Sequence, residues 1–593
     1  MPEENARKGA RILAAVLAAL IIAASSISVL STIRMCRDIP FAWDSAGHAW
    51  EGLIIAQDIM TGDLVSLMGD TYRQGWWPFF HSWLLAPAYI LLGNSYSAAR
   101  SVSLVCFVGF LITLYLIGLE MSERMGHWVG LSAVVLATTS MPILAYSAMS
   151  MTEVPGLFMS ALTLLFYLKA LRSRRASFMF AASIFMSLTF FTQWHHGVFV
   201  ISAILLMQML NTPPIFSRAS LCLLCPFTLL MVGWFVYPQH ITSFINHATF
   251  QPHYYRFWSL ENFGYYPKSF LQVYHSSPLV ATVVVMSVLL SVRKLREAKV
   301  KVLFLNLLVG IGLLTFKLDH RHRYIITLVP IIWILGSHEF VAFVSGVAAY
   351  VKNARQRFAC LLTGSLCVCL LMVPGVVRMY RTYPQSLIQY EFWSDQRQKE
   401  AYEFIAENVT GHRDLAMFSS WDYFNSLKGP TVRWQLEARR FDEEVRSREK
   451  KQKTMQYVRN LLANRNGLAF SELVGYFGSR NVNVLEYHLL SFMKALNGDA
   501  YKEYRQAHAL NPFSDKIADV LRMDERITCV LGVYRNGEED LNQYAERFFA
   551  GQSTWKEVSV RRFEDLNIVL KIYERRSGPG MPADAGASGK IEE

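Results

Sequence analysis

Long apolar runs fill the first two thirds of the chain and stop near residue 378. A helix that crosses a membrane needs about 20 mostly apolar residues. Runs of roughly this length occur at 12–33, 97–118, 128–148, 153–170, 176–192, 197–210, 218–237, 277–292, 301–316, 324–345 and 358–378. A further apolar run at 79–92 is expected to form a re-entrant or interfacial helix. The pattern predicts a polytopic, all-α membrane bundle of about 11 helices.

Beyond residue 379 the pattern changes to one rich in Arg, Glu, Asp, Asn and Gln. Short apolar stretches at 414–418 and 567–573 are typical of strands, and the charged stretch 434–464 is expected to be helical. The end of the chain, 577–593, has the Gly, Pro and Ala content of a disordered tail. We therefore expect a membrane domain over 1–378 and a soluble α/β domain over 379–576.

Composition agrees with many spans, because 52% of residues are hydrophobic and only 18% are charged. The net charge of +12 does not require a nucleic-acid partner. Much of the basic excess lies in short loops such as 169–175 and 293–301, and Lys and Arg favour the cytoplasmic side. We infer a multi-pass protein of the plasma or inner membrane, with its N-terminus inside. An odd number of spans then places the C-terminal domain outside the cytoplasm.

Two long outer loops, 34–80 and 238–276, are rich in aromatic residues. Such rings either anchor the chain at the lipid headgroups or line a cleft for a headgroup or sugar. Within the first loop, 44–61 is expected to form an amphipathic helix that lies on the outer surface and ends at Gly62. Its apolar positions are Leu53, Ile54, Ala56 and Ile59, and its polar positions are His48, Glu51, Gln57 and Asp58.

Two carboxylates stand out at the outer side of the predicted bundle. Asp44 follows the first span, and Glu153 lies between two later spans. Each has a structural explanation: Asp44 as a helix N-cap, and Glu153, with Pro155, as the start of a helix. The alternative is that both belong to a site at the membrane surface that acts on a lipid-borne substrate.

Four segments, in order along 40–335, resemble the GT-C class of membrane glycosyltransferases. They are the acid Asp44, a proline-aromatic helix followed by G-x-S-x-x-A-A-R within 77–100, Thr-acid-x-Pro at 152–155, and R-Y-x-x-x-x-x-P at 323–330. The sequence looks most similar to the dolichyl-phosphate-mannose protein mannosyltransferase-like and aminoarabinose transferase-like family. Residues after 379 carry no motif of that family.

The resemblance implies a glycosyltransferase that moves a hexosyl or pentosyl group from a polyprenyl-phosphate carrier. The acceptor would be a protein, glycolipid or polymer of the cell envelope, on the extracytoplasmic side. Asp44 is expected to be the general base and Glu153 a second acid, and the two could share a divalent metal. Residues expected to contact the lipid phosphate or the sugar are Arg73, His195, His196, Lys317, His320, Arg321, Arg323 and Tyr324.

The sequence departs from the family at three positions. The Lys that often precedes the first-loop proline is absent from 73–78, and Gln193 stands where relatives often carry Lys. Asp44 is followed by Ser45, whereas many protein mannosyltransferases carry two adjacent acids. These departures leave the phosphate contacts and the sugar open. The alternative functions are a transporter or flippase of a lipid-linked substrate and a non-catalytic envelope assembly protein. Transporters tend to place charges within their spans, and here the charges lie near span ends.

Overall fold

The chain folds into two compact units, each built from separated stretches of sequence. A computed structural model describes residues 2–349 apart from 42, 76, 211–213, 215–216, 250–258, 276 and 317–320, and then residues 377, 380–381, 398–409, 414–419, 427, 429–447, 451–452, 455–456, 483–488, 528–535, 549, 555–566 and 568–576. The first unit comprises Met1–Arg37, Gln74–Ala88 and Ser97–Tyr390. The second comprises Asp38–Arg73, Tyr89–Tyr96 and Glu391–Glu593.

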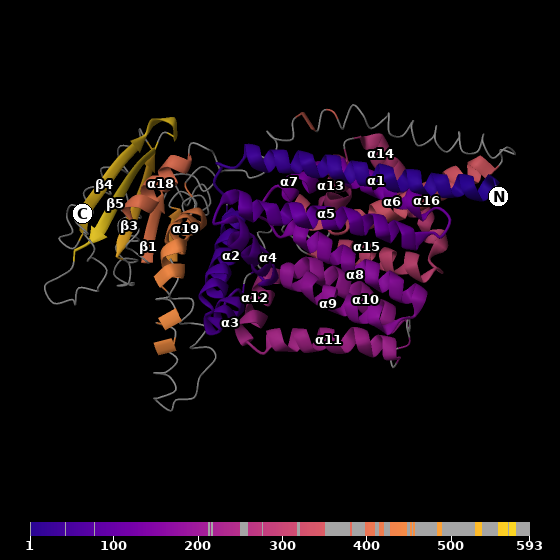
Figure 1. Ribbon diagram of the computed structural model, residues 1–593, viewed down its shortest axis with the longest axis horizontal. Coiled ribbons are helices and arrows are strands. Elements are labelled where there is room, and N and C mark those ends of the chain that lie inside the picture. Colours follow the sequence, from indigo (N-terminus) through magenta and orange to yellow (C-terminus); the bar gives the residue numbers. More distant parts are fainter. Residues whose placement is uncertain are drawn as a thin grey trace. The chain divides into compact units, whose positions relative to one another are not determined.

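The first unit is helical, and most of its long helices run alongside one another (Figure 1). Its helices are α1 (Pro2–Met35), α4 (Phe80–Leu92), α5 (Tyr96–Met121), α6 (Gly126–Thr138), α7 (Met141–Ser147), α8 (Glu153–Ser173), α9 (Ala176–Thr192), α10 (Trp194–Met209), α11 (Arg218–Phe235), α12 (Pro238–Thr249), α13 (Leu260–Val273), α14 (Pro278–Ser291), α15 (Ala298–Phe316) and α16 (Val329–Ala349). Two short 3-10 helices, η1 (Val292–Lys294) and η2 (His322–Ile325), precede α15 and α16. The last residues of α4 belong to the second unit.

Helices occur at every predicted span from 12–33 to 324–345, and 79–92 is a helix as expected. The predicted span 358–378 lies outside the described residues, apart from residue 377. Within the described part of the chain, six helices are long and apolar enough to cross a membrane, or seven if α6 and α7, which meet at 74°, form one broken span. The predicted number of 11 spans is therefore not confirmed, but the helices indicate an integral membrane protein.

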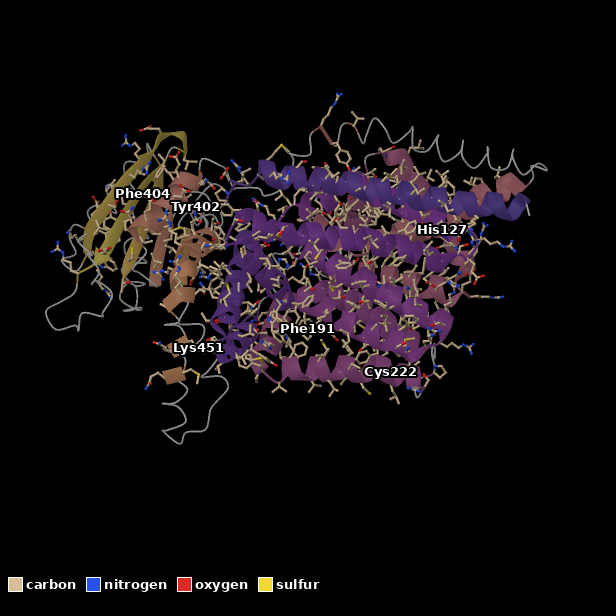
Figure 2. All side chains as sticks on the ribbon, viewed as in Figure 1. His127, Phe191, Cys222, Tyr402, Phe404 and Lys451 are labelled. Carbon is tan, nitrogen blue, oxygen red and sulfur yellow. The ribbon has the colours of Figure 1, made fainter. Side chains whose placement is uncertain are left out.

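Close helix packing in the first unit depends on small residues at a crossing point. A Cβ added to Gly118 of α5 would lie 2.3 Å from the Cα of Gly130 in α6, so the two backbones touch there. Small residues allow membrane helices to approach in this way. Figure 2 shows His127 and Cys222 toward one end of the helical unit and Phe191 toward the other. The predicted topology likewise puts residues 127 and 222 at the inner end of the bundle and residue 191 at its outer end.

The second unit combines a mixed sheet with helices. The helices are α2 (Trp43–Thr61), α3 (Leu64–Tyr72), α18 (Gln398–Asn408) and α19 (Gly429–Ser447), and the strands are β1 (Asp414–Ser419), β2 (Asn483–His488), β3 (Cys529–Arg535), β4 (Trp555–Phe563) and β5 (Ile568–Arg575). The strand order is β2-β1-β3-β5-β4. β1 pairs in parallel with β2 and β3, whereas β5 pairs antiparallel with β3 and β4. Both predicted strands are thus confirmed, as β1 and β5.

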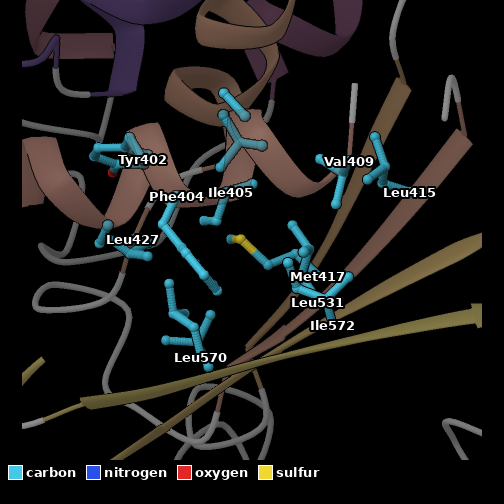
Figure 3. Close-up of a cluster of buried hydrophobic side chains, with 14 of the residues drawn as sticks. Tyr402, Phe404, Ile405, Val409, Leu415, Met417, Leu427, Leu531, Leu570 and Ile572 are labelled. Carbon is cyan, nitrogen blue, oxygen red and sulfur yellow. The ribbon is translucent and has the colours of Figure 1, made fainter. Parts of the chain in front are cut away.

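Helix α18 covers one face of this sheet. Its buried side chains Tyr402 and Ile405 belong to one apolar cluster with Met417, Leu531 and Ile572 from three strands (Figure 3). The helix predicted at 434–464 begins earlier, at Gly429, and α19 ends at Ser447. The predicted tail 577–593 lies outside the described residues.

Helix α2 ends where the sequence predicted, because Gly62 takes a left-handed φ of 65°. Its polar positions, however, do not face solvent. His48, Gln57 and Asp58 are 1–3% exposed, whereas the apolar Ile59 is 43% exposed. The prediction of a helix with one water-facing polar side was therefore wrong: periodicity locates the polar positions but does not say what packs against them.

Candidate active site

Glu153 begins helix α8 and is completely buried. The Nη1 atom of Arg323, from the short helix η2, lies 3.5 Å from its Oε1 atom. The N-terminus of α8 adds partial positive charge near the same carboxylate. A buried carboxylate is costly unless it is paired, so Arg323 and the helix end together explain why a charge is tolerated here.

Two predicted histidines lie at the start of α10 beside this pair. The break between α9 and α10 is a single extended residue, Gln193, with φ −159° and ψ 127°. The His195 ring lies 4.4 Å from the His196 ring and 5.0 Å from the Tyr324 ring. Tyr324 in turn lies 5.8 Å from the guanidinium carbon of Arg323. The structure therefore links Arg323 to Glu153 and, through Tyr324, to both histidines.

His196 packs against the first turn of α8. A Cβ added to Gly156 would lie 2.2 Å from Nδ1 of His196, so the ring touches the backbone one turn after Glu153. Within the described part of the chain, neither ring nitrogen of His196 has a hydrogen-bond partner, and the residue is fully buried. The Oε1 atom of Gln193 is also buried and has no hydrogen-bond partner among the described residues. Buried polar atoms rarely lack a hydrogen-bond partner, and these atoms can bind a polar group of a substrate.

Helix η2 is held from the side of α13. The hydroxyl of Tyr274 donates to the backbone oxygen of His322 at 2.7 Å, and Nδ1 of His322 lies 2.9 Å from Oγ of Ser269. The Tyr265 ring stacks on His322 with centroids 5.4 Å apart. These contacts fix the residue that precedes Arg323 and so orient its side chain toward α8.

The other predicted cations of this stretch are Lys317, His320 and Arg321. Arg321 directly precedes η2 and is exposed. Lys317 and His320 lie outside the described residues. Their predicted role at the lipid phosphate stays a prediction.

Asp44 lies in the first turn of α2, in the second unit, and is half-buried. Glu153 lies in the first unit. Their predicted convergence in one site, with or without a shared metal, stays a prediction. Among the described residues, no group of three or more His, Cys, Asp or Glu side chains is placed to hold a metal ion.

Arg73 lies in a buried ion network of the second unit. Its Nη1 donates to Glu51 at 2.9 Å, its Nη2 donates to the other Glu51 oxygen, and its Nε donates to Asp70 at 2.5 Å. Burial would lower the pKa of Arg73, but the Glu51 and Asp70 carboxylates outweigh it and raise that pKa above its usual value. Three of its five N–H groups are used here, so a phosphate contact would depend on the other two.

Two residues of this arrangement were not predicted. Gln193 was noted only as a departure from the family, and Gly156 follows the Thr-acid-x-Pro motif by one residue. A polar residue between two apolar runs was the available signal for Gln193. For Gly156, the sequence holds no signal that a ring from another helix would pack on it.

Comparison with known proteins agrees with the resemblance carried by the motifs. A profile of the family described as dolichyl-phosphate-mannose-protein mannosyltransferase matches residues 77–237. The structure of ArnT from Cupriavidus metallidurans bound to undecaprenyl phosphate superimposes with a TM-score of 0.55 at 12% identity, covering 93% of this chain and 97% of that chain. The chain shares the ArnT fold. ArnT in the apo state matches over the same shares, with a TM-score of 0.55 at 13% identity.

A more distant match is the oligosaccharyltransferase AglB from Archaeoglobus fulgidus in complex with an inhibitory peptide and a dolichol-phosphate. It has a TM-score of 0.45 at 10% identity and covers 71% of this chain and 63% of that chain. No curated protein sequence matches the chain. The ArnT fold and the family match confirm the predicted resemblance to GT-C glycosyltransferases.

Proposed function

We propose that the protein is an integral membrane glycosyltransferase that moves a sugar from a polyprenyl-phosphate carrier to an acceptor on the extracytoplasmic side. The observation that carries the proposal is the buried Glu153–Arg323 pair, linked through Tyr324 to two histidines, in a chain with the ArnT fold. The ArnT structure with undecaprenyl phosphate supports a lipid phosphate as the donor's leaving group.

The reaction breaks the bond between the anomeric carbon and the phosphate oxygen and forms a bond from that carbon to the acceptor. The polyprenyl phosphate leaves with the electron pair, and the attacking hydroxyl or amine loses a proton. Asp44 is the base in this scheme, since a half-buried carboxylate at a helix start can accept a proton from a bound acceptor. The transferred group is a hexose or pentose.

Arg323 is the residue that we assign to the leaving phosphate. A guanidinium binds phosphate through paired N–H donors, and Glu153 orients it by taking up one side of the fork. The ring nitrogens of His196 have no hydrogen-bond partner among the described residues, and Nδ1 lies beside the first turn of α8, so the ring can bind a phosphate or sugar oxygen. Glu153 is then the second acid of the site, acting through Arg323.

The same proposal assigns places to the rest of the chain. Residues 1–378 form the catalytic membrane domain, and 379–576 form an extracytoplasmic part that bears on the choice of acceptor. The acceptor is a protein, glycolipid or polymer of the cell envelope.

The test compares envelope glycans by mass spectrometry in cells that lack the gene and in cells that carry wild-type or Asp44→Asn protein. We expect the wild type to restore a sugar modification and Asp44→Asn to abolish it at equal protein level. Asp38→Asn is the matched control, because this acid of the same loop is 40% exposed and pairs with the partly exposed Lys399 at 2.8 Å. Such pairs contribute little.

Two results would overturn the proposal. Full activity of Asp44→Asn would remove the base. Movement of a lipid-linked sugar across vesicle membranes without transfer to any acceptor would indicate a flippase instead.

A further inference from the structure

Helix α19 packs against the residues that lead into α2, the helix that carries Asp44. Its Thr431 donates a hydrogen bond of 2.8 Å from Oγ1 to the backbone oxygen of Phe41, and both residues are buried. The Trp434 ring of the same helix meets the Phe41 ring edge-on, with centroids 5.0 Å apart. Phe41 lies three residues before Asp44, so these contacts fix the chain as it enters α2.

A second contact holds α2 beyond its first turn. The guanidinium carbon of Arg433 lies 4.6 Å from the Trp50 ring, and that of Arg73 lies 4.8 Å from the same ring. Trp50 is 7% exposed and comes less than two turns after Asp44. Two cations on one buried indole restrict rotation of α2, because each contact depends on the orientation of the ring.

The same face of α19 also binds the last turn of α4 and the residues that follow it. Tyr96 stacks on Trp434 with centroids 4.5 Å apart, and Nε1 of Trp434 donates to the Tyr89 hydroxyl at 3.2 Å. Nδ2 of Asn94 donates to the backbone oxygen of Ala438 at 2.5 Å. Helix α19 therefore holds together two segments of the family resemblance: 38–61, which contains Asp44, and 89–96, which contains the start of the G-x-S-x-x-A-A-R motif.

We propose that α19 is a positioning element of the active site, with Thr431, Arg433 and Trp434 as positioning residues for Asp44. The inference rests on the proposed role of Asp44 as the base. It assigns the C-terminal part of the chain a direct part in setting the geometry of proton removal, in addition to any choice of acceptor. A base misplaced by about 1 Å costs on the order of 100-fold in rate.

Arg433→Ala is the main test, read out as kcat and donor KM in purified full-length protein. We expect kcat to fall at least tenfold with little change in donor KM, because the contacts that we assign to the phosphate come from other residues. Arg433→Lys should recover part of kcat, since it keeps a cation over Trp50. Thr431→Val is a milder second variant that removes one hydrogen bond and keeps the shape of the side chain.

Arg439→Ala is the matched control. Arg439 lies on the same helix, but its side chain is 38% exposed and pairs with Glu407 at 3.0 Å, so its loss should leave kcat unchanged. Equal effects of the two alanine variants, or an unchanged kcat in Arg433→Ala, would overturn the positioning role while leaving the proposed function intact.

Hydrogen exchange of full-length protein tests the same inference without any substrate. Amides of 41–50 should exchange faster in Arg433→Ala than in wild type or in Arg439→Ala. Unchanged protection at 41–50 would contradict the proposal. If wild-type protein transfers no sugar, the proposed function fails, and the exchange result still decides whether α19 holds this loop.

Discussion

Unlike the partly exposed pair of Arg172 and Glu120, Arg323 and Glu153 form a buried ion pair. Their side chains are 12% and 1% exposed, whereas that of Arg172, which pairs with Glu120, is 57% exposed. Arg323→Lys keeps the charge but loses the fork that binds a phosphate through two donors. We expect the donor KM to rise about tenfold, a loss of about 1.4 kcal/mol. Initial rates at varied donor concentration would measure this.

Arg172→Lys is the control for that substitution, and its kinetics should match those of the wild type. If Arg323→Lys left the donor KM unchanged, the phosphate would have to bind elsewhere.

Gly156 offers a second test of single residues, because it leaves room for the His196 ring. A methyl group there would lie 2.2 Å from Nδ1 and force the ring away from α8. We expect Gly156→Ala to lower turnover at least tenfold if His196 binds the substrate. Gly312→Ala, in a helix where a Cβ meets nothing within 4 Å, should be neutral or stabilise by up to about 1 kcal/mol. Equal turnover in the two variants would exclude His196 from the site.

Five residues grouped around the Glu153–Arg323 pair were candidates by sequence, but their grouping could not be predicted. His195, His196, Arg323 and Tyr324 were all candidates, as was Glu153. Their spacing along the chain does not show that η2 reaches the start of α8, because that contact depends on how α8, α10 and α13 pack. Lys317 and His320 were equally good candidates by sequence, but they lie outside the described residues, so their place relative to this group stays a prediction.

At the scale of elements, the crossing of α5 and α6 is the contact most sensitive to size. A Cβ on Gly118 would meet the backbone of Gly130, which cannot move aside as a flexible side chain can. We expect Gly118→Ala to destabilise the protein by about 1–3 kcal/mol, as overpacking does. Gly233→Ala in α11, with nothing within 4 Å, is the control. Thermal unfolding in detergent would compare the two variants, and similar midpoints would show that the backbones at Gly118 and Gly130 are not in contact.

Hydropathy located the helices well and their interruptions less well. The run 128–148 was predicted as one span, but the chain breaks at Ser140 and α7 begins with Pro142 in its first turn. The gap expected between 192 and 197 is one extended residue, Gln193. A window of about 20 residues averages over such breaks, and a single extended residue leaves the average almost unchanged.

For the whole molecule, the predicted domain boundary near 379 stays a prediction, and the two compact units of the structure are discontinuous in sequence. The face of α19 is covered by Phe41, Tyr89 and Tyr96, which belong to the N-terminal part of the chain. We expect a fragment of residues 391–593 to expose the buried ring of Trp434 and to lack cooperative unfolding. Tryptophan fluorescence during urea titration would test this, with the full-length protein as reference. A sharp transition in the fragment would show that its fold does not need residues 38–73 and 89–96.

The hydrogen bond between Thr431 and Phe41 joins residues 390 positions apart. At about 5–20 residues per second, the ribosome needs about 20–80 s to make the intervening chain. During that interval the segment around Phe41 has left the ribosome, but α19, which packs against it, has not yet been synthesised. A protein cut short by a premature stop before α19 would insert its apolar helices in the membrane yet hold an unfinished loop. Catalytic competence would thus report that translation has passed α19.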